Sequence, residues 1–254
     1  MNLRSVATFA RWTAVELLRE RILYVVLLFA ALLVASSCIL TPLAPGAQAQ
    51  VVVDFGLGAI DALGVLVILL SGTALLRREI ERRSLDVLLS KPLGRLEYLL
   101  GKCLGLVATL CVLTLAMTAI FATSLVASGF GWRAAYLQAI GAQALELLVL
   151  ASLAVLFSCF TSPTLAALFT LGLFAAGHLS ETVLRLSANP TANEIVRAAR
   201  WVLPALGLFD LRGEVVHGVA VEPARLLAAA AYAGLYALTT LYVASLVFRR
   251  RDFR

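Results

Sequence analysis

Charged residues are scarce in this sequence, and very few fall within its long apolar runs. Asp, Glu, Lys and Arg make up 14% of the 254 residues, whereas hydrophobic residues make up 61% and the mean hydropathy is +0.95. Soluble domains usually contain about 25% charged and about 45–50% apolar residues. Repeated runs close to the ~20 residues that cross a bilayer explain this excess. The composition therefore excludes an ordinary soluble domain and indicates a multi-pass membrane protein.

Redox motifs and nucleic-acid signatures are also missing. The cysteines Cys38, Cys103, Cys111 and Cys159 form no CxxC pair and fall in apolar runs, which predicts buried free thiols. A net charge of +6 favours nucleic acid in a soluble protein. Beside membrane spans, however, basic residues orient the spans and contact anionic headgroups. We therefore expect membrane lipids, and no nucleic acid, among the partners.

Six apolar segments are expected to be membrane spans, and the fold class is therefore all-α. The expected ranges are 22–41, 55–76, 103–127, 138–160, 164–184 and 226–248. Basic residues cluster before the first span, between the second and third, and after the last. An even number of spans puts these clusters on one side, which the positive-inside rule makes cytoplasmic. We expect a single polytopic membrane domain over 1–254, with six transmembrane helices, N-in and C-in.

Residues 1–21 are expected to form an amphipathic N-terminal helix in the cytoplasmic interface. Apolar side chains from Leu3 to Leu18 share one stripe, basic ones share the other side, and Trp12 suits the headgroup level. A plain cytoplasmic tail is the alternative. The following apolar run exceeds the ~7–15 residues of a signal-peptide core, so we expect it to be retained. This holds although Ala47-Gln48-Ala49 resembles a cleavage site.

Charge is concentrated between the second and third spans, in residues 77–102. Ser84 suits the N-cap of a short helix over 85–90, with Asp86 in its first turn. Lys91-Pro92 would end that helix, because proline biases its predecessor away from helical conformation. From these residues alone, a helix contacted by a cytoplasmic partner and an ordinary lipid-facing loop are equal alternatives.

The same segment resembles the cytoplasmic signature of type-2 ABC exporter permeases, most closely that of the NosY-like branch. The matching string is Glu79-x-Glu81-x-x-Ser84-Leu85-x-x-Leu88-Leu89-Ser90-x-Pro92-x-x-Arg95-x-Glu97-x-x-x-Gly101-Lys102, with Arg83-Ser84 where the family often has Gly-Thr. The resemblance implies a bacterial inner-membrane protein whose coupling loop over 77–102 docks on an ATPase subunit. It also implies an external segment with short helices over 185–225. The residues then expected to couple to the ATPase are Glu79, Glu81, Arg82, Arg83, Ser84, Asp86, Lys91, Pro92, Arg95 and Glu97.

A phosphate-binding loop is lacking in these residues. Gly101-Lys102 has no glycine five residues before Gly101, and Cys103 stands where Ser or Thr is required. We therefore expect no enzyme activity and no cofactor in this chain, with ATP and Mg²⁺ bound by a separate nucleotide-binding ABC ATPase subunit. The resemblance further implies a dimer with a second permease copy or a paralogue. A periplasmic or accessory protein is a further candidate partner.

Few polar residues lie within the expected spans. Glu146 is near the middle of the fourth span, Gln143 is one turn before it, and Asp61 is near one end of the second. These residues are candidates for lining a pathway or, equally, for hydrogen bonding between helices. His178 and Glu181 are expected to be interfacial polar residues. No metal site is expected, because nothing in the sequence supplies the remaining ligands.

The transported substrate is left open by the sequence. The principal expectation is the permease subunit of an ATP-binding cassette exporter. A non-transporting anchor or signal-relay subunit that contacts an ATPase through the same loop is an alternative. An intramembrane enzyme is a further alternative, and Glu146 alone would be its catalytic group.

Overall fold

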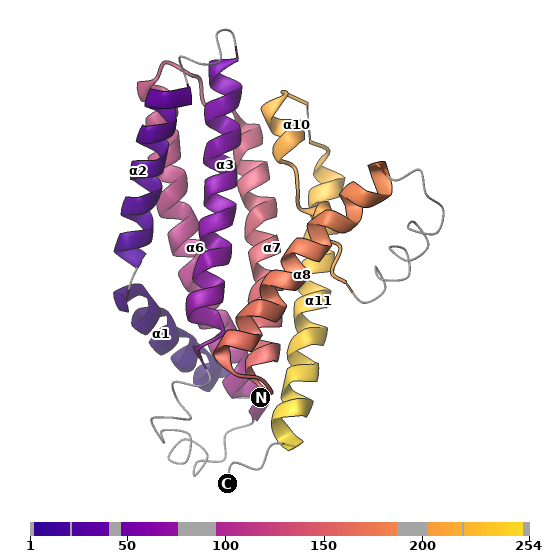
Figure 1. Cartoon of the computed structure of the whole chain (residues 1–254). Coiled ribbons are helices and arrows are strands. Elements are labelled where there is room, and N and C mark those ends of the chain that lie inside the picture. The colour runs from indigo at the N-terminus through magenta and orange to yellow at the C-terminus, as the bar shows by residue number, and fades with distance from the viewer. Residues whose placement is uncertain are drawn as a thin grey trace.

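The computed structural model describes residues 3–20, 22–40, 47–75, 95–186, 203–219 and 221–250, and all regular structure in these ranges is helical. Its long helices run alternately up and down in one bundle (Figure 1). The all-α fold class is confirmed for the described residues. The long helices are α2 (Ile22–Leu40), α3 (Gln48–Val67), α6 (Arg95–Ala127), α7 (Ala134–Ser158), α8 (Pro163–Leu186) and α11 (Pro223–Arg250).

Four helical stretches in the described residues are long and apolar enough to cross a membrane. They are Gln48–Gly72, Tyr98–Ala127, Ala134–Ser158 and Pro223–Val247. The shorter apolar stretches Tyr24–Ser36 and Pro163–Leu179 lie in α2 and α8, at the positions of the first and fifth expected spans. Helices therefore occur at all six expected positions, and length and composition support four of them as spans.

The start of α3 differs from the sequence expectation. The helix begins at Gln48 rather than at residue 55, so Asp61, expected near one end of its span, lies well inside the helix. Gln48, Gln50 and Asp54 favour a loop over 48–54 when the segment is considered alone. In the structure Val52 and Val53 are buried, and α3 packs against α2 and α10 (Arg212–Val216). Tertiary packing of an apolar face thus extends the helix through a polar stretch.

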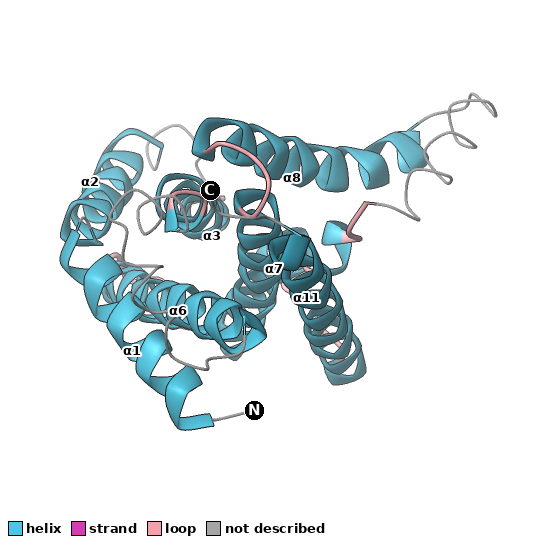
Figure 2. Cartoon of the chain, turned by 90° about the horizontal axis from the view of Figure 1, so that it is seen from below, coloured by secondary structure: helices cyan, strands magenta, loops and turns pink. Residues whose placement is uncertain are grey.

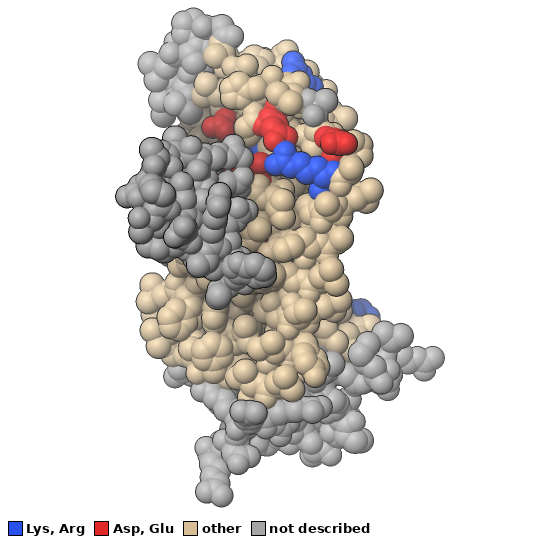
Figure 3. Space-filling view, turned by 90° about the vertical axis from the view of Figure 1, so that its right-hand side faces the viewer, with Lys and Arg blue, Asp and Glu red and all other residues tan. Residues whose placement is uncertain are grey.

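The outer surface of the bundle is strongly apolar. Leu27, Leu115, Leu168, Leu227 and Leu235 are each more than half exposed. Figure 3 shows charged side chains gathered at the α10 end of one face, above a broad and almost uncharged surface. Apolar surface this extensive is unfavourable in water but matches the hydrocarbon of a bilayer. The molecule is therefore a membrane-embedded, multi-pass protein.

The cysteines differ from one another in exposure. Cys103 and Cys159 are buried free thiols, as expected, whereas Cys111 is exposed on α6. The expectation that all four are buried is therefore wrong for Cys111. Its apolar run belongs to a helix with an outward surface, and lipid can solvate a thiol there as a protein core does elsewhere.

The N-terminal helix α1 (Leu3–Glu20) lies across the end of the bundle at which α11 also ends (Figures 1 and 2). It packs chiefly against α6, burying Val6, Thr13 and Leu17, while Trp12 is 73% exposed. The expected helix is confirmed, but its apolar stripe is shifted. Ala7, expected on that stripe, is exposed, and Thr13 is buried instead.

Two glycines one turn apart on α6 determine how closely α1 approaches. A Cβ on Gly101 would lie 2.6 Å from the Cβ of Phe9. A Cβ on Gly105 would lie 2.5 Å from the Cβ of Thr13 and 2.8 Å from the carbonyl oxygen of Ala10. Non-bonded carbon atoms pack at about 3.5–4.0 Å. The GxxxG pattern at the start of α6 is therefore the contact site for α1, in line with the use of small residues between membrane helices.

The substitution Gly105→Ala is expected to weaken this contact. Its methyl group would meet the backbone of α1, and overpacking of this kind costs about 1–3 kcal/mol. Thermal unfolding of the purified protein in detergent, followed by circular dichroism, measures the loss. Gly141→Ala on α7 is the matched control, because nothing lies within 4 Å of the added Cβ. Equal melting temperatures for the two variants would contradict the proposed contact.

Candidate functional site

The carboxyl group of Glu146 lies in the middle of α7 and is almost completely buried, at 2% exposure. A buried carboxylate without a partner costs several kcal/mol. Its partner comes from α8, where Nε2 of His178 lies 2.7 Å from Oε1 of Glu146. The ring of Phe174, one turn earlier on α8, meets the imidazole edge-on at 4.8 Å between centroids. The imidazole is thus held between a carboxyl group and an aromatic ring.

This pairing differs from the sequence expectation for His178. His178 and Glu181 are neighbours along α8 and were expected to be interfacial polar residues. In the structure His178 faces Glu146 of α7, and the side chain of Glu181 lies outside the described residues. No pattern in the sequence connects His178 with Glu146, because the two residues are far apart in the chain and belong to different helices.

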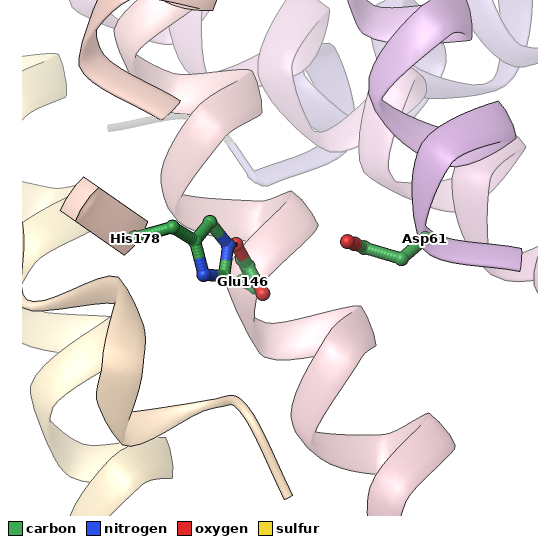
Figure 4. A group of neighbouring side chains, drawn as sticks. All are labelled: Asp61, Glu146 and His178. Carbon is green, nitrogen blue, oxygen red and sulfur yellow. Dashed lines mark hydrogen bonds and ion pairs between the residues drawn. The ribbon is translucent and has the colours of Figure 1, made fainter. Parts of the chain in front are cut away.

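Asp61 approaches the same pair from α3, on the opposite side (Figure 4). One carboxylate oxygen each from Asp61 and Glu146 and a ring nitrogen of His178 all lie within 4.8 Å of one another. Oδ1 of Asp61 is buried and has no hydrogen-bond partner among the described residues. Three helices therefore bring two acidic groups and an imidazole to one point.

Gln143 adds a fourth polar group one turn from Glu146. Its Nε2 donates a hydrogen bond of 3.0 Å to the carbonyl oxygen of Leu57 on α3, while its Oε1 is buried without a partner among the described residues. Asp61, Gln143 and Glu146, which were separate candidates in the sequence, thus lie in one site. Gln143 and Glu146 each contact a group on another helix, and their expected role stays a prediction.

These side chains line a cavity of about 900 Å³ between α3, α7 and α8. Leu66, Leu69 and Leu171 contribute apolar wall, and the segment 207–214 and Arg225 line its remaining side. Charged and polar side chains also line it: Asp61, Gln143, Glu146, His178, Asp210, Arg212, Glu214 and Arg225. The cavity therefore combines apolar walls with a charged interior, which suits a polar or amphipathic ligand.

Residues 203–219, the described part of the chain after α8, line one side of the cavity. They contain the 3₁₀ turn η3 (Leu206–Leu208) and the short helix α10. Leu206 and Phe209 are buried, and the backbone N–H of Ala205 donates a hydrogen bond of 2.9 Å to the hydroxyl of Tyr232 on α11. Short helices were expected in the external segment 185–225. The described part of that segment has them, packed against the bundle.

An ion pair connects α10 to the start of α3. Nε of Arg212 lies 3.1 Å from Oδ1 of Asp54, and the two side chains are 43% and 54% exposed. An exposed pair of this kind contributes about 0.2–1 kcal/mol. The guanidinium lies over Gly58, where an added Cβ would be 2.5 Å from Nη1. Because the pair is weak, this contact at the cavity rim can open at low cost.

A cysteine introduced at Ala62 is expected to react with a membrane-impermeant maleimide. Ala62 lines the cavity and is exposed, so the thiol would meet water and ionise. The control is Leu115→Cys, at a position that is 69% exposed on the outer surface and would face lipid. Both variants are made in a protein whose native cysteines have been replaced, and they are labelled in nanodiscs. Labelling at position 62 should be at least about tenfold faster than at position 115, because only a thiolate reacts readily. Equal rates at the two positions would contradict a hydrated cavity.

The coupling residues expected from the sequence fall mainly beyond the described part of the chain. Arg95 and Glu97 lie at the start of α6, and their side chains are not described. The others lie outside the described residues: Glu79, Glu81, Arg82, Arg83, Ser84, Asp86, Lys91 and Pro92.

The helix leading into that segment ends in a π turn, η2 (Ile68–Gly72). The N–H of Thr73 donates to the carbonyl of Ile68 at 3.2 Å, one residue further back than in an α-helix. The hydroxyl of Ser158, at the end of α7, lies within hydrogen-bond distance, 2.9 Å, of the carbonyl of Thr73. Such turns occur frequently at functional sites. The π turn thus lies on the route from Asp61 to the charged segment.

Comparison with models of protein families identifies a family for this chain. A family model described as "ABC-2 family transporter protein" matches residues 17–252, which include all of the described helices after α1. A search of curated proteins found no matching relative.

Proposed function

The chain belongs to the ABC-2 transporter family, and we propose that it is the permease subunit of an ATP-binding cassette exporter. Membrane subunits of this family generally work with an ABC ATPase and are not themselves enzymes. The observation that carries the proposal is the family match over 17–252. The cavity between α3, α7 and α8 supports it as a place where a substrate can bind.

The proposed topology has six spans, with both chain ends in the cytoplasm of a bacterial inner membrane. The helices α2 and α8 supply the two spans whose described apolar stretches are short. Helix α1 and the end of α11 lie at one end of the bundle, as this topology requires (Figure 1). The cavity residues Asp210 and Arg212 follow α8 and precede α11, so the cavity opens toward the external side.

The proposed coupling segment, residues 77–102, connects α3 with α6 and includes the first residues of α6. Helix α3 carries Asp61 and leads into the π turn, and α6 carries the contact site for α1. A push on 77–102 by an ATPase would therefore move α3, α6 and α1 together. The NosY-like resemblance, a dimer with a second copy or paralogue, and ATP and Mg²⁺ in the partner subunit belong to this proposal. An accessory protein on the external side is a further proposed partner.

An intramembrane enzyme is the alternative that the cavity bears on most directly. The pair Glu146 and His178 could transfer protons, but a nucleophile is also needed for acyl transfer or covalent proteolysis. The described residues that line the cavity include no Ser, Thr or Cys. The acid–base groups are thus more consistent with ligand binding than with covalent catalysis.

The function is tested on the chain purified from its native membrane together with any ABC ATPase that binds it. The complex, reconstituted in proteoliposomes, should release on ATP addition a molecule that copurifies with it and is identified by mass spectrometry. Copurification of the ATPase without ATP-dependent movement of any bound molecule would favour the anchor or signal-relay alternative. Failure of an ABC ATPase to copurify would contradict the proposal.

Reversing two charges of the coupling segment, Asp86→Lys together with Arg95→Glu, is expected to uncouple the complex. ATP hydrolysis can drive movement only if the permease contacts the two states of the ATPase differently. In this proposal the charged side chains of residues 77–102 make the contacts that differ. Stimulation of ATPase activity by the permease should fall at least about tenfold, which corresponds to about 1.4 kcal/mol. Unfolding temperature should not change.

Arg133→Glu is the control for this experiment. Arg133 is exposed and precedes α7, at the opposite end of the bundle from α1. It should leave ATPase stimulation unchanged. Retained stimulation and transport in the double reversal would overturn the assignment of residues 77–102 as the coupling segment.

A further inference from the structure

We propose that Asp61, Glu146 and His178 form a binding site for a divalent transition-metal ion of the zinc type, within the cavity between α3, α7 and α8. The proposal goes beyond the proposed transport function, and ion binding is measured without transport or ATP hydrolysis. It replaces the expectation that the chain holds no metal, which rested on the absence of further ligands near His178 and Glu181.

The geometry of the three groups fits one ion. Each comes from a different helix, and their ligand atoms lie within 4.8 Å of one another. Zinc binds imidazole nitrogen and carboxylate oxygen at about 2.0–2.2 Å, so ligand atoms around one ion lie about 3.3 Å apart. Side-chain adjustments on the order of 1 Å bring Asp61 into that range. Three protein ligands leave a fourth position for water, as in zinc sites with an open position.

Two unpartnered oxygens provide an independent indication of a ligand. Oε1 of Gln143 belongs to a side chain that is 6% exposed and lines the cavity, and it has no partner among the described residues. Oδ1 of Asp61, on a half-buried side chain, is also buried and without a hydrogen-bond partner among the described residues. A buried acceptor left unsatisfied costs about 1–3 kcal/mol. An ion bound by Asp61 satisfies Oδ1 of Asp61 directly, and a water on the ion provides a donor for Oε1 of Gln143.

The charges around the cavity also favour a cation. Arg225 pairs with Glu214, and Arg212 pairs with Asp54. Asp61 and Glu146 then face each other with His178 as the neighbouring base, and Asp210 adds a further acidic side chain to the lining. Two carboxylates match the charge of a divalent ion. The imidazole ligand selects zinc-type ions over Mg²⁺ and Ca²⁺, which prefer all-oxygen ligand sets.

An ion in this position would connect α3, α7 and α8. These helices also meet through the hydrogen bond from Gln143 to Leu57 and the contact of Glu146 with His178. The ion would therefore stabilise the arrangement in which the three helices are close together. Binding of the ion should raise the unfolding temperature of the whole protein, because the site exists only in the folded chain.

Zinc binding is measured on the full-length protein, purified without a histidine tag, by competition with a chromogenic chelator. We expect one Zn²⁺ per chain and a Zn²⁺-dependent rise in unfolding temperature. Asp61→Asn, Glu146→Gln and His178→Ala should each weaken binding at least about tenfold, since each removes a ligand. Co²⁺ in place of Zn²⁺ should give visible absorption bands of a four- or five-coordinate site, and Glu146→Gln should abolish these bands.

His217→Ala is the matched control, because the sequence contains only two histidines. His217 is exposed and lies outside the cavity, with its Nδ1 2.8 Å from the carbonyl oxygen of Gly213. Its substitution should leave zinc affinity unchanged. Glu146→Gln and Asp61→Asn keep the size of the side chains, so they decide the matter if His178→Ala does not fold.

Three outcomes would overturn the site. Equal zinc affinity in the wild type, Glu146→Gln and Asp61→Asn would show that these residues are not ligands. A loss in His217→Ala as large as in His178→Ala would indicate adventitious surface binding. Displacement of Zn²⁺ by an equal concentration of Mg²⁺ would indicate a general cation-attracting cavity and no transition-metal site.

Discussion

The burial of the Glu146 carboxyl group in the middle of α7 is the constraint on which the site depends. A charged or polar group at that depth must meet a partner, and the partner is His178, 2.7 Å away on α8. The contact requires the outer part of α8 to approach α7. The chain after α8 then packs closely as well, since a Cβ on Gly177 would lie 2.7 Å from the side chain of Leu206. One buried carboxyl group thus accounts for the position of α8 and for the segment that lines one side of the cavity.

The helices could be predicted from the sequence, but their meeting points could not. Long apolar runs place the six long helices within a few residues, except at two helix starts: packing extends α3 back to Gln48, and α6 begins at Arg95. A periodic pattern relates residues within one helix, such as Gln143 and Glu146, and says nothing about a residue on another helix. The sequence therefore does not predict the partners of Asp61 and His178. It associates His178 only with Glu181, its neighbour on the same helix. The number of spans and the role of residues 77–102 stay predictions.

Close packing at small residues is what allows these helices to act as one body. A Cβ on Gly56 of α3 would lie 2.4 Å from the ring of Phe121 on α6, and one on Gly64 would lie 2.6 Å from the side chain of Leu147 on α7. Small residues let membrane helices approach where no hydrophobic driving force exists between them. Helix α3 thus joins rigidly to α6 and α7 on both sides of Asp61. Its one irregular stretch is the π turn, which separates this rigid part from the charged segment.

This arrangement links the occupancy of the cavity to the positions of the helices. An ion or substrate that contacts Asp61, Glu146 and His178 together binds more tightly when α3, α7 and α8 are close, and less tightly when they separate. By thermodynamic linkage, the two effects are equal in size. The factor by which separation of the helices lowers the ligand's affinity is the factor by which the bound ligand shifts the equilibrium toward the closed arrangement. A movement of α3 would therefore change the affinity of the site for the ligand that Asp61 contacts. Because the charged groups belong to three different helices, a small relative movement is enough to release what they hold.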